Sequence, residues 1–194
     1  NSGKMQASRS STRLGQPVSV IAEEFLITEH ETGLIIIDMR KAIVYIAHMC
    51  LRSEYEQGKV RSRPLLLPSH QTVTETQASL FEKEGQLNAL GLDIRRVGPH
   101  TVALREIPIA LEQADASSIV AVLIEFLCAP GSTIDTLLEK LSNCIARESI
   151  LTDSTSLSAL LGTMESLNIE PPHPPICRCL GSNELARLLG KNDV

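Results

Sequence analysis

A short apolar run, Gly33-Leu34-Ile35-Ile36-Ile37-Asp38, constrains the fold of this chain more than any other segment. The run is far shorter than the roughly 20 residues that span a bilayer, and its consecutive isoleucines favour a buried β-strand. Two short β-type runs, 18–22 and 25–28, precede the apolar run, and the turn-like segment 30–33 leads into it. We therefore predict a hairpin whose second strand is buried on both faces.

The composition predicts an aliphatic core. The 194 residues are 43% hydrophobic but include no Trp, two Tyr and three Phe, so Leu, Ile, Val and Ala must fill the interior. Aromatics this scarce disfavour a base-stacking nucleic-acid platform, and a formal net charge of −5 disfavours a strongly basic DNA clamp. The hydrophobic fraction excludes disorder over most of the chain, and the length fits one domain of two small lobes.

The remaining patterns mix helices with strands and do not repeat a regular βαβ unit. Strand patterns flank a turn at 98–100, and the prolines Pro64 and Pro68 keep 61–68 extended. Helical patterns cover 39–57, 74–90, 116–127, 133–151, 154–167 and 184–189. The predicted N-caps are Asp115 for the third helix, either Asp153 or Ser154 for the fifth, and Asn183 for the last. Strand patterns cover 92–97 and 101–107. The predicted fold class is α/β (α+β).

The cysteines and the N-terminal segment indicate an intracellular fragment. The five cysteines are odd in number and irregularly spaced: Cys50, Cys128, Cys144, Cys177 and Cys179. We interpret them as reduced thiols of a cytoplasmic protein. Residues 1–13 are polar and are expected to be a disordered linker or a cloning scar at the start of a piece of a longer protein. No apolar run is long enough to cross a membrane.

An ordered set of motifs resembles the C-terminal dimerisation domain of the MutL family of DNA mismatch-repair proteins. The similarity runs from about Gly15 to the end of the chain. It includes the 33–38 strand, the Pro64–Pro68 element, Leu90-Gly91-Leu92-Asp93-Ile94, the strand 102–108, Ile145-Ala146-Arg147 and Arg178. No single motif is diagnostic, and the order of the set carries the resemblance.

The departures from the family pattern concern its endonuclease site. Competent members carry Asp-Gln-His-Ala followed by two Glu, where carboxylates and His help to hold a divalent metal. Here Asp38 is retained, but Met39, Arg40 and Lys41 follow it. The other ligand positions of the three family motifs fall on Val44, Met49, Ser142, Asn143, Pro174 and Ile176. The resemblance therefore implies the branch without nuclease activity, with no catalytic residue, no metal and no cofactor in this fragment.

The resemblance implies a two-lobed domain that joins two copies of a longer protein. A discontinuous dimerisation lobe would take residues 14–60 and 150–194, and an inserted regulatory lobe residues 61–149. The homodimer would hold two ATPase-bearing protomers together as a clamp on DNA, with weak or no direct DNA binding. Candidate interface residues are Leu34, Ile35, Ile36, Ile37, Ile43 and Ile46. A sliding clamp and other mismatch-repair proteins are further expected partners.

The segment Arg63-Pro64-Leu65-Leu66-Leu67-Pro68 has two interpretations. It is either a connector strand held by its leucines in the core, or an extended peptide whose leucines dock into a pocket of a ring-shaped clamp. The family element opens with Gln, and Arg63 stands at that position. We expect the lost amide to weaken or abolish clamp binding.

Other residues leave alternatives open. Asp38 is a helix N-cap or a leftover metal ligand, and the N-cap is favoured because Asp is a preferred capping residue. His173, Cys177 and Cys179 are structural groups in a Pro-rich loop or a small metal cluster of poor spacing. A divergent metal-dependent endonuclease would use Asp38 with these three residues. An unrelated α/β protein-interaction module is the third alternative.

Overall fold

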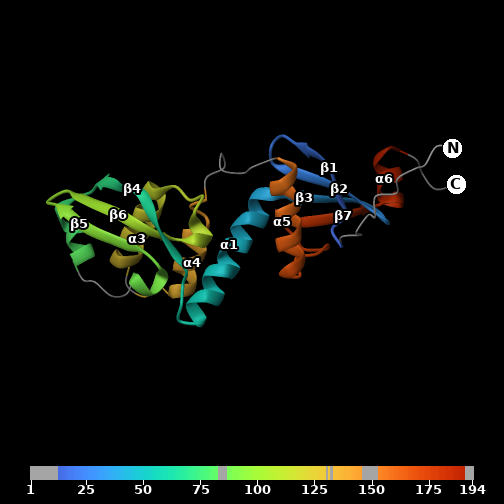
Figure 1. Ribbon diagram of the computed structural model, residues 1–194. Helices are drawn as coiled ribbons and strands as arrows, with labels where there is room; N and C mark the ends of the chain where they lie inside the picture. The colour runs from blue at the N-terminus through green and yellow to red at the C-terminus, as the bar shows by residue number, and fades with distance from the viewer. Residues whose placement is uncertain (1–12, 83–86, 130, 132, 146–152, 191–194) are drawn as a thin grey trace, which may run out of the picture. The chain divides into compact units, whose positions relative to one another are not determined.

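The computed structural model describes residues 13–82, 87–129, 131, 133–145 and 153–190, which form two compact α+β units (Figure 1). The first unit comprises Asn1–Ile43 and Ile150–Val194, and the second comprises Val44–Ser149. The boundary falls inside α1 (Met39–Glu56), whereas the sequence places the lobe boundary near residue 60. None of the helices in the described ranges is long and apolar enough to cross a membrane.

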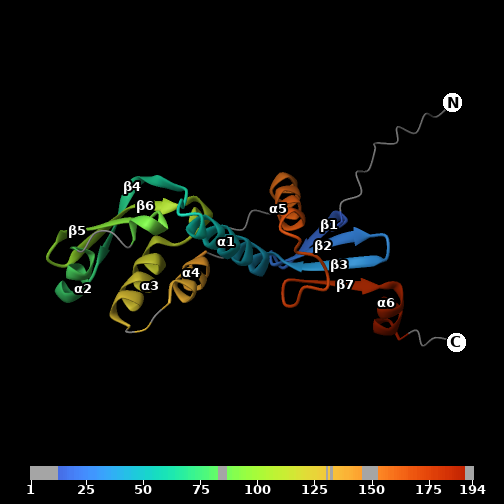
Figure 2. The ribbon, with the colours of Figure 1, turned by 90° about the horizontal axis from the view of Figure 1, so that it is seen from below.

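The first unit contains a four-stranded antiparallel sheet (Figure 2). Its strand order is β1 (Gln16–Ile21), β2 (Phe25–His30), β3 (Gly33–Asp38) and β7 (Cys177–Gly181). The predicted hairpin is confirmed, because β2 pairs with β3 from Phe25–Asp38 to His30–Gly33. The helix α5 (Ser154–Ser166) lies beside β1, with Asp153 as its N-cap.

The register divides this sheet into a covered face and a half-exposed face. Leu26 pairs with Ile37 and Thr28 with Ile35, and all four side chains are buried. The opposite face carries the pair Ile27–Ile36, and both of these residues are only half-buried. The prediction that the second strand of the hairpin is buried on both faces is therefore wrong within the chain.

Two turns of this sheet have unusual backbone conformations. Gly33 has a φ of 151°, and a Cβ there would lie 2.1 Å from the carbonyl oxygen of Leu180, so only glycine allows β7 to approach. In the β1–β2 turn, Glu24 N–H donates to the Ile21 carbonyl at 3.1 Å, while Ala22 and Glu23 have φ values of 53° and 54°. Consecutive left-handed residues without glycine strain the backbone.

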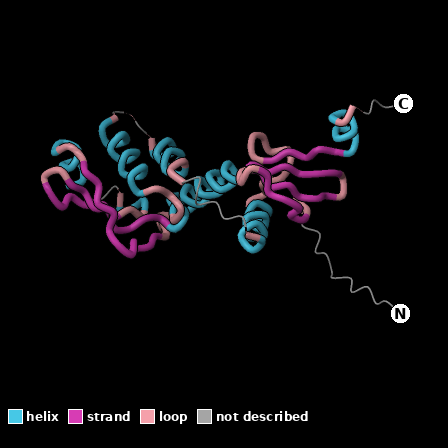
Figure 3. The backbone as a smooth tube through the Cα atoms, turned by 90° about the horizontal axis from the view of Figure 1, so that it is seen from above, coloured by secondary structure: helices cyan, strands magenta, loops and turns pink. Residues whose placement is uncertain are grey.

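The second unit packs helices around a three-stranded sheet with the order β4-β6-β5 (Figure 3). The strands are β4 (Ser62–Thr72), β5 (Asp93–Gly98) and β6 (Thr101–Pro108). The helices are α2 (Glu75–Ser79), α3 (Ala116–Cys128) and α4 (Ile134–Ser142). The buried cluster includes Leu104, Leu111 and Leu123, and Phe81 is the one aromatic among the fully described buried residues, which confirms the aliphatic core.

Several predicted elements differ from the structure at their ends. The helix expected over 74–90 is α2 followed by single 3₁₀ turns at 80–82 and 88–90, with 83–86 outside the described residues. The helix expected over 133–151 ends at Ser142, because Cys144 N–H turns back to the Leu141 carbonyl, and 146–151 lie outside the described residues.

The C-terminal segment also differs from what its sequence predicts. The strand β7 was not predicted, because the Cys-Arg-Cys-Leu-Gly segment after a proline cluster resembles a loop. The last helix, α6 (Ser182–Leu188), begins at Ser182, and its N-cap is Gly181, not Asn183. The Gly181 N–H donates to the Glu184 carboxylate at 3.2 Å, which fixes the earlier start.

The Asp115 cap of α3 generates a stability prediction. Its carboxylate accepts hydrogen bonds from the Ser118 N–H at 2.8 Å and from the hydroxyls of Ser117 and Ser118. These hydrogen bonds lower the pKa of Asp115 to about 2, and the bond from the Ser117 hydroxyl contributes most. We expect Asp115→Ala to lower the free energy of unfolding in urea by about 1 kcal/mol at neutral pH.

This contribution depends on pH with a defined sign. A depressed carboxyl pKa stabilises the fold fully above the unfolded pKa of about 3.9, and the stabilisation declines as the pH falls toward the folded pKa of about 2. The control Asp115→Asn keeps a capping acceptor but cannot titrate. A gap between the wild type and Asp115→Ala that stays constant from neutral pH down to the acid range would contradict this assignment.

Candidate functional site

Asp38 ends β3 and caps α1. One carboxylate oxygen accepts the Lys41 N–H at 2.9 Å, and the other lies 2.9 Å from Lys41 Nζ. The side chain is buried, so the bound N–H and ammonium replace water around the charge. The predicted N-cap role is confirmed, and the cation that occupies the carboxylate comes from the chain itself.

The fold brings one further family ligand position beside Asp38. The Asp38 N–H donates to the Ile176 carbonyl at 2.8 Å, which joins segments 138 positions apart in sequence. Ile176 is buried and apolar, so this neighbour offers no side-chain donor. Pro174, two residues earlier, is exposed and also lacks one.

The family positions in the second unit make local hydrogen bonds. Buried Ser142 donates its hydroxyl to the Leu138 carbonyl at 2.8 Å, and the Asn143 amide donates to the Glu139 carbonyl at 2.9 Å. Val44 and Met49 lie on α1 and are apolar. Within the described ranges, no three His, Cys, Asp or Glu side chains gather closely enough to hold a metal ion. The endonuclease alternative therefore finds no ligand set there.

The residues of the proposed Cys–His cluster have structural roles. His173 and Cys177 exchange backbone hydrogen bonds of 3.1 and 3.0 Å in a small turn that leads into β7. Burial raises the pKa of the Cys177 thiol. Cys179 Sγ lies 3.6 Å from the Thr32 hydroxyl.

The half-exposed face of the first sheet carries several apolar side chains. We give the name open face to its half-buried apolar residues, Phe25, Ile27, Leu34, Ile36 and Leu180; exposed Glu29, opposite Leu34, and Ile21, opposite Phe25, lie on the same side of the sheet. Leu34 pairs with Leu180, and Ile36 lies between Ile27 and Arg178. Arg178 is exposed and its guanidinium donates to Glu184 at 3.1 Å, which gives this face a polar border.

Of the interface residues predicted from the sequence, some lie on the open face and others lie in the core. Ile35 and Ile37 are buried in the chain's own core at 2% and 0% exposure, so they are not available to a partner, whereas Leu34 and Ile36 are. Ile43 and Ile46 are half-buried on α1. Phe25, Ile27 and Leu180 were missed. The alternation of Phe25 and Ile27 along β2 is the signal that could have identified two of them.

The Arg63–Pro68 segment lies in β4, an edge strand of the second sheet. Regular pairing with β6 stops at Pro64–Glu106 and resumes at Ser69–Leu104, so the strand bulges between them. Leu66 and Leu67 lie in the bulge with 102% and 82% of their surfaces exposed, while Leu65 packs partly against the core. The interpretation that these leucines are core residues holds only for Leu65.

A family model for the MutL C terminal dimerisation domain matches residues 18–157, which run from β1 into the start of α5. The chain belongs to this family. The matched range contains β3, the Asp38 cap and the β4 bulge, so the surfaces described above lie on the dimerisation domain or directly beside it.

Curated relatives of this MutL-type domain are whole mismatch-repair proteins. Over 121 residues, the chain is 31% identical to the DNA mismatch repair protein MutL of Pseudomonas paraeruginosa, 30% to that of Pseudomonas aeruginosa and 28% to that of Cellvibrio japonicus. Each match covers 62% of this chain but only 19% of the relative. The chain thus spans about a fifth of the length of the MutL proteins it matches.

Substitutions at Asp38 can distinguish a helix cap from a metal ligand in this MutL-type domain. We expect Asp38→Ala to lower the free energy of unfolding by about 1 kcal/mol, because α1 loses its N-terminal acceptor. Asp38→Ser retains a capping oxygen and is expected to recover most of that loss. Urea denaturation with and without millimolar Mn²⁺ measures both effects. A stabilisation by Mn²⁺ that the wild type shows and Asp38→Ser loses would identify a metal ligand instead.

Proposed function

We propose that this domain joins two copies of a MutL-type mismatch-repair protein through the open face of the first sheet. The observation that supports this proposal is the row of apolar side chains across β2, β3 and β7 that the chain itself leaves half-covered. An obligate interface resembles a core cut in half, and a central sheet face with a polar border has that character.

Symmetry favours a second copy as the partner. A two-fold axis sets the same patch against itself, so an apolar face that contacts its own equivalent needs no complementary charge. Burying apolar area contributes roughly 25 cal/mol per Å², which makes the five side chains of the open face a main source of association energy. The polar pair Arg178–Glu184 would then lie at the rim.

The dimer would hold two longer protomers together as a clamp on DNA. The relatives named DNA mismatch repair protein MutL are about five times longer than the matched segment, and their remaining length leaves room for the expected ATPase modules. We propose that this fragment is itself non-catalytic, cytoplasmic and without a cofactor. The capped Asp38 and the apolar Val44, Met49 and Ile176 support this view.

Charge placed in the open face tests the dimer. We expect Ile36→Lys to weaken dimerisation at least about 100-fold, because a buried unpaired ammonium is costly. Sedimentation velocity across a concentration series measures the effect. Val97→Lys is the matched control, since Val97 is an exposed strand residue of the second unit. Equal dissociation constants for Ile36→Lys and the wild type would place the interface elsewhere.

A second candidate function, docking to a sliding clamp, is favoured by the β4 bulge. Leu66 and Leu67 project fully from an edge strand, as an extended peptide motif requires, and Pro64 and Pro68 bracket them. Arg63 at the family's Gln position pairs with Glu112 at 3.4 Å. We propose a weakened clamp-binding element at this position.

The bulge predicts a separable binding defect. We expect Leu66→Ala with Leu67→Ala to reduce binding to a bacterial sliding clamp about tenfold or more without changing stability, because both side chains are already exposed. Arg63→Gln is expected to strengthen binding. Leu188→Ala with Leu189→Ala is the matched control, another pair of adjacent exposed leucines. Surface plasmon resonance on immobilised clamp measures all three, and an equal loss in the control would contradict a specific site.

A further inference from the structure

The strand β1 lies at one edge of the first sheet and carries exposed apolar side chains. β1 occupies the edge position beside β2, and no other strand in the described ranges pairs with its far side. Val18 and Ile21 have 60% and 55% of their surfaces exposed. Pro17 has no N–H and the register shifts between Pro17 and Ser19, so the regular part of this edge, which can present backbone donors and acceptors to an added strand, is Ser19–Ile21.

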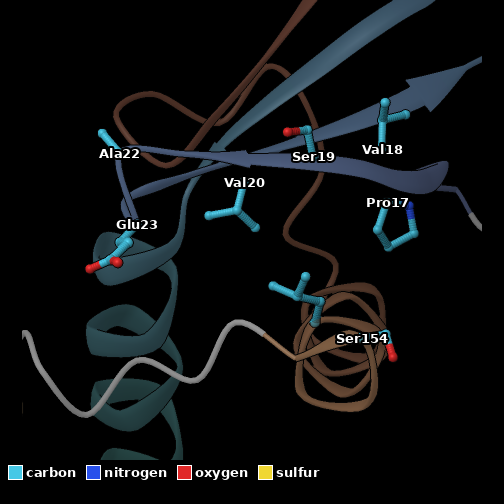
Figure 4. A pocket seen from close by; sticks show the side chains of 8 residues that line it. Pro17, Val18, Ser19, Val20, Ala22, Glu23 and Ser154 are labelled. Atoms are coloured by element: carbon cyan, nitrogen blue, oxygen red, sulfur yellow. The ribbon is translucent and has the colours of Figure 1, made fainter.

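A groove runs beside this edge, between β1 and the start of α5 (Figure 4). Its volume is about 540 Å³, and Pro17, Val20 and Leu157 form its apolar part. Pro17 and Val20 point toward α5, on the face that the register assigns to Leu26 and Thr28. A strand added at the edge would therefore place every second side chain above this groove.

One end of the groove carries a negative charge, and a second carboxylate belongs to the residue next to its other end. Exposed Glu23 lines the end at the β1–β2 turn. Ser154 lines the other end and directly follows Asp153, the α5 cap, whose pKa is lowered by hydrogen bonds from the Ser156 hydroxyl and N–H. Glu23 and its neighbour Ala22 lie in this turn with φ values of 54° and 53°.

We propose that β1 and this groove bind an extended segment of another protein by strand addition, and that the segment has aliphatic residues at alternate positions with Lys or Arg at its ends. The free edge supplies backbone hydrogen bonds, Pro17, Val20 and Leu157 receive the aliphatic side chains, and the acidic ends select a basic partner. This site is distinct from the open face, whose side chains leave the opposite side of the sheet.

A second copy of the chain fits this edge poorly. Antiparallel pairing of two β1 strands would bring the Glu23 of one copy to the Ser154 end of the other, next to the carboxylate-bearing Asp153 in sequence, so like charges would come together. β1 itself spans six residues, which sets the length of a matching segment at about five residues.

The direct test uses the whole chain and the fluorescein-labelled, C-terminally amidated peptide Lys-Ile-Thr-Ile-Lys as the probe. Fluorescence polarisation is expected to show saturable binding, and amide NMR shifts are expected to concentrate on residues 16–21. The same peptide N-methylated at its three central residues cannot form a ladder, and we expect it to bind at least about tenfold more weakly.

Matched charge reversals complete the experiment. Glu23→Lys is expected to weaken binding about fivefold. Glu31→Lys makes the same charge change in the exposed β2–β3 turn and is expected to leave binding within about twofold. Equal binding of the N-methylated peptide, equal loss in both variants, or no binding at millimolar peptide would overturn the proposal. Protection of the β1 amides that grows with protein concentration alone would show self-pairing instead and would also overturn it.

Discussion

The pairing of β3 between β2 and β7 decides which side chains this domain keeps inside and which it offers to a partner. With Ile37 opposite Leu26 and Ile35 opposite Thr28, one row of the strand enters the core. The same register places Leu34 and Ile36 on the open face beside Ile27 and Leu180. A slip of one residue would exchange the two rows, so core packing and the face proposed for dimerisation depend on the same hydrogen bonds.

The end of the same strand bears on the proposal that this domain is non-catalytic. Asp38 ends β3, and β7 brings Ile176 against its backbone, so the geometry that gathers family ligand positions persists. What differs is the side chains, since Lys41 occupies the carboxylate and Ile176 is an apolar neighbour. The backbone pairing needs only β-forming residues on these strands, so the fold does not depend on metal-ligating side chains at these positions.

The sequence predicts the parts of this fold that local patterns determine. The 25–38 hairpin, the Asp115 and Asp153 caps and the aliphatic core follow from alternation, capping preference and composition. The strand β7 and the half-exposed state of Ile36 do not, because both depend on a segment about 140 residues away. The exposure of Leu66 and Leu67 could not be predicted from the sequence either, because a bulge interrupts the regular alternation of side chains between the two faces of the strand.

The most direct test of the central claim is the identity of the methyl groups that meet between two copies. An isotope-filtered NOE experiment on dimers mixed from labelled and unlabelled chains records only intermolecular contacts. Dimerisation through the open face predicts such contacts among the methyl groups of Ile27, Leu34, Ile36 and Leu180. Intermolecular contacts confined to other surfaces, such as Val18 on the β1 edge or Leu66 in the β4 bulge, would contradict it.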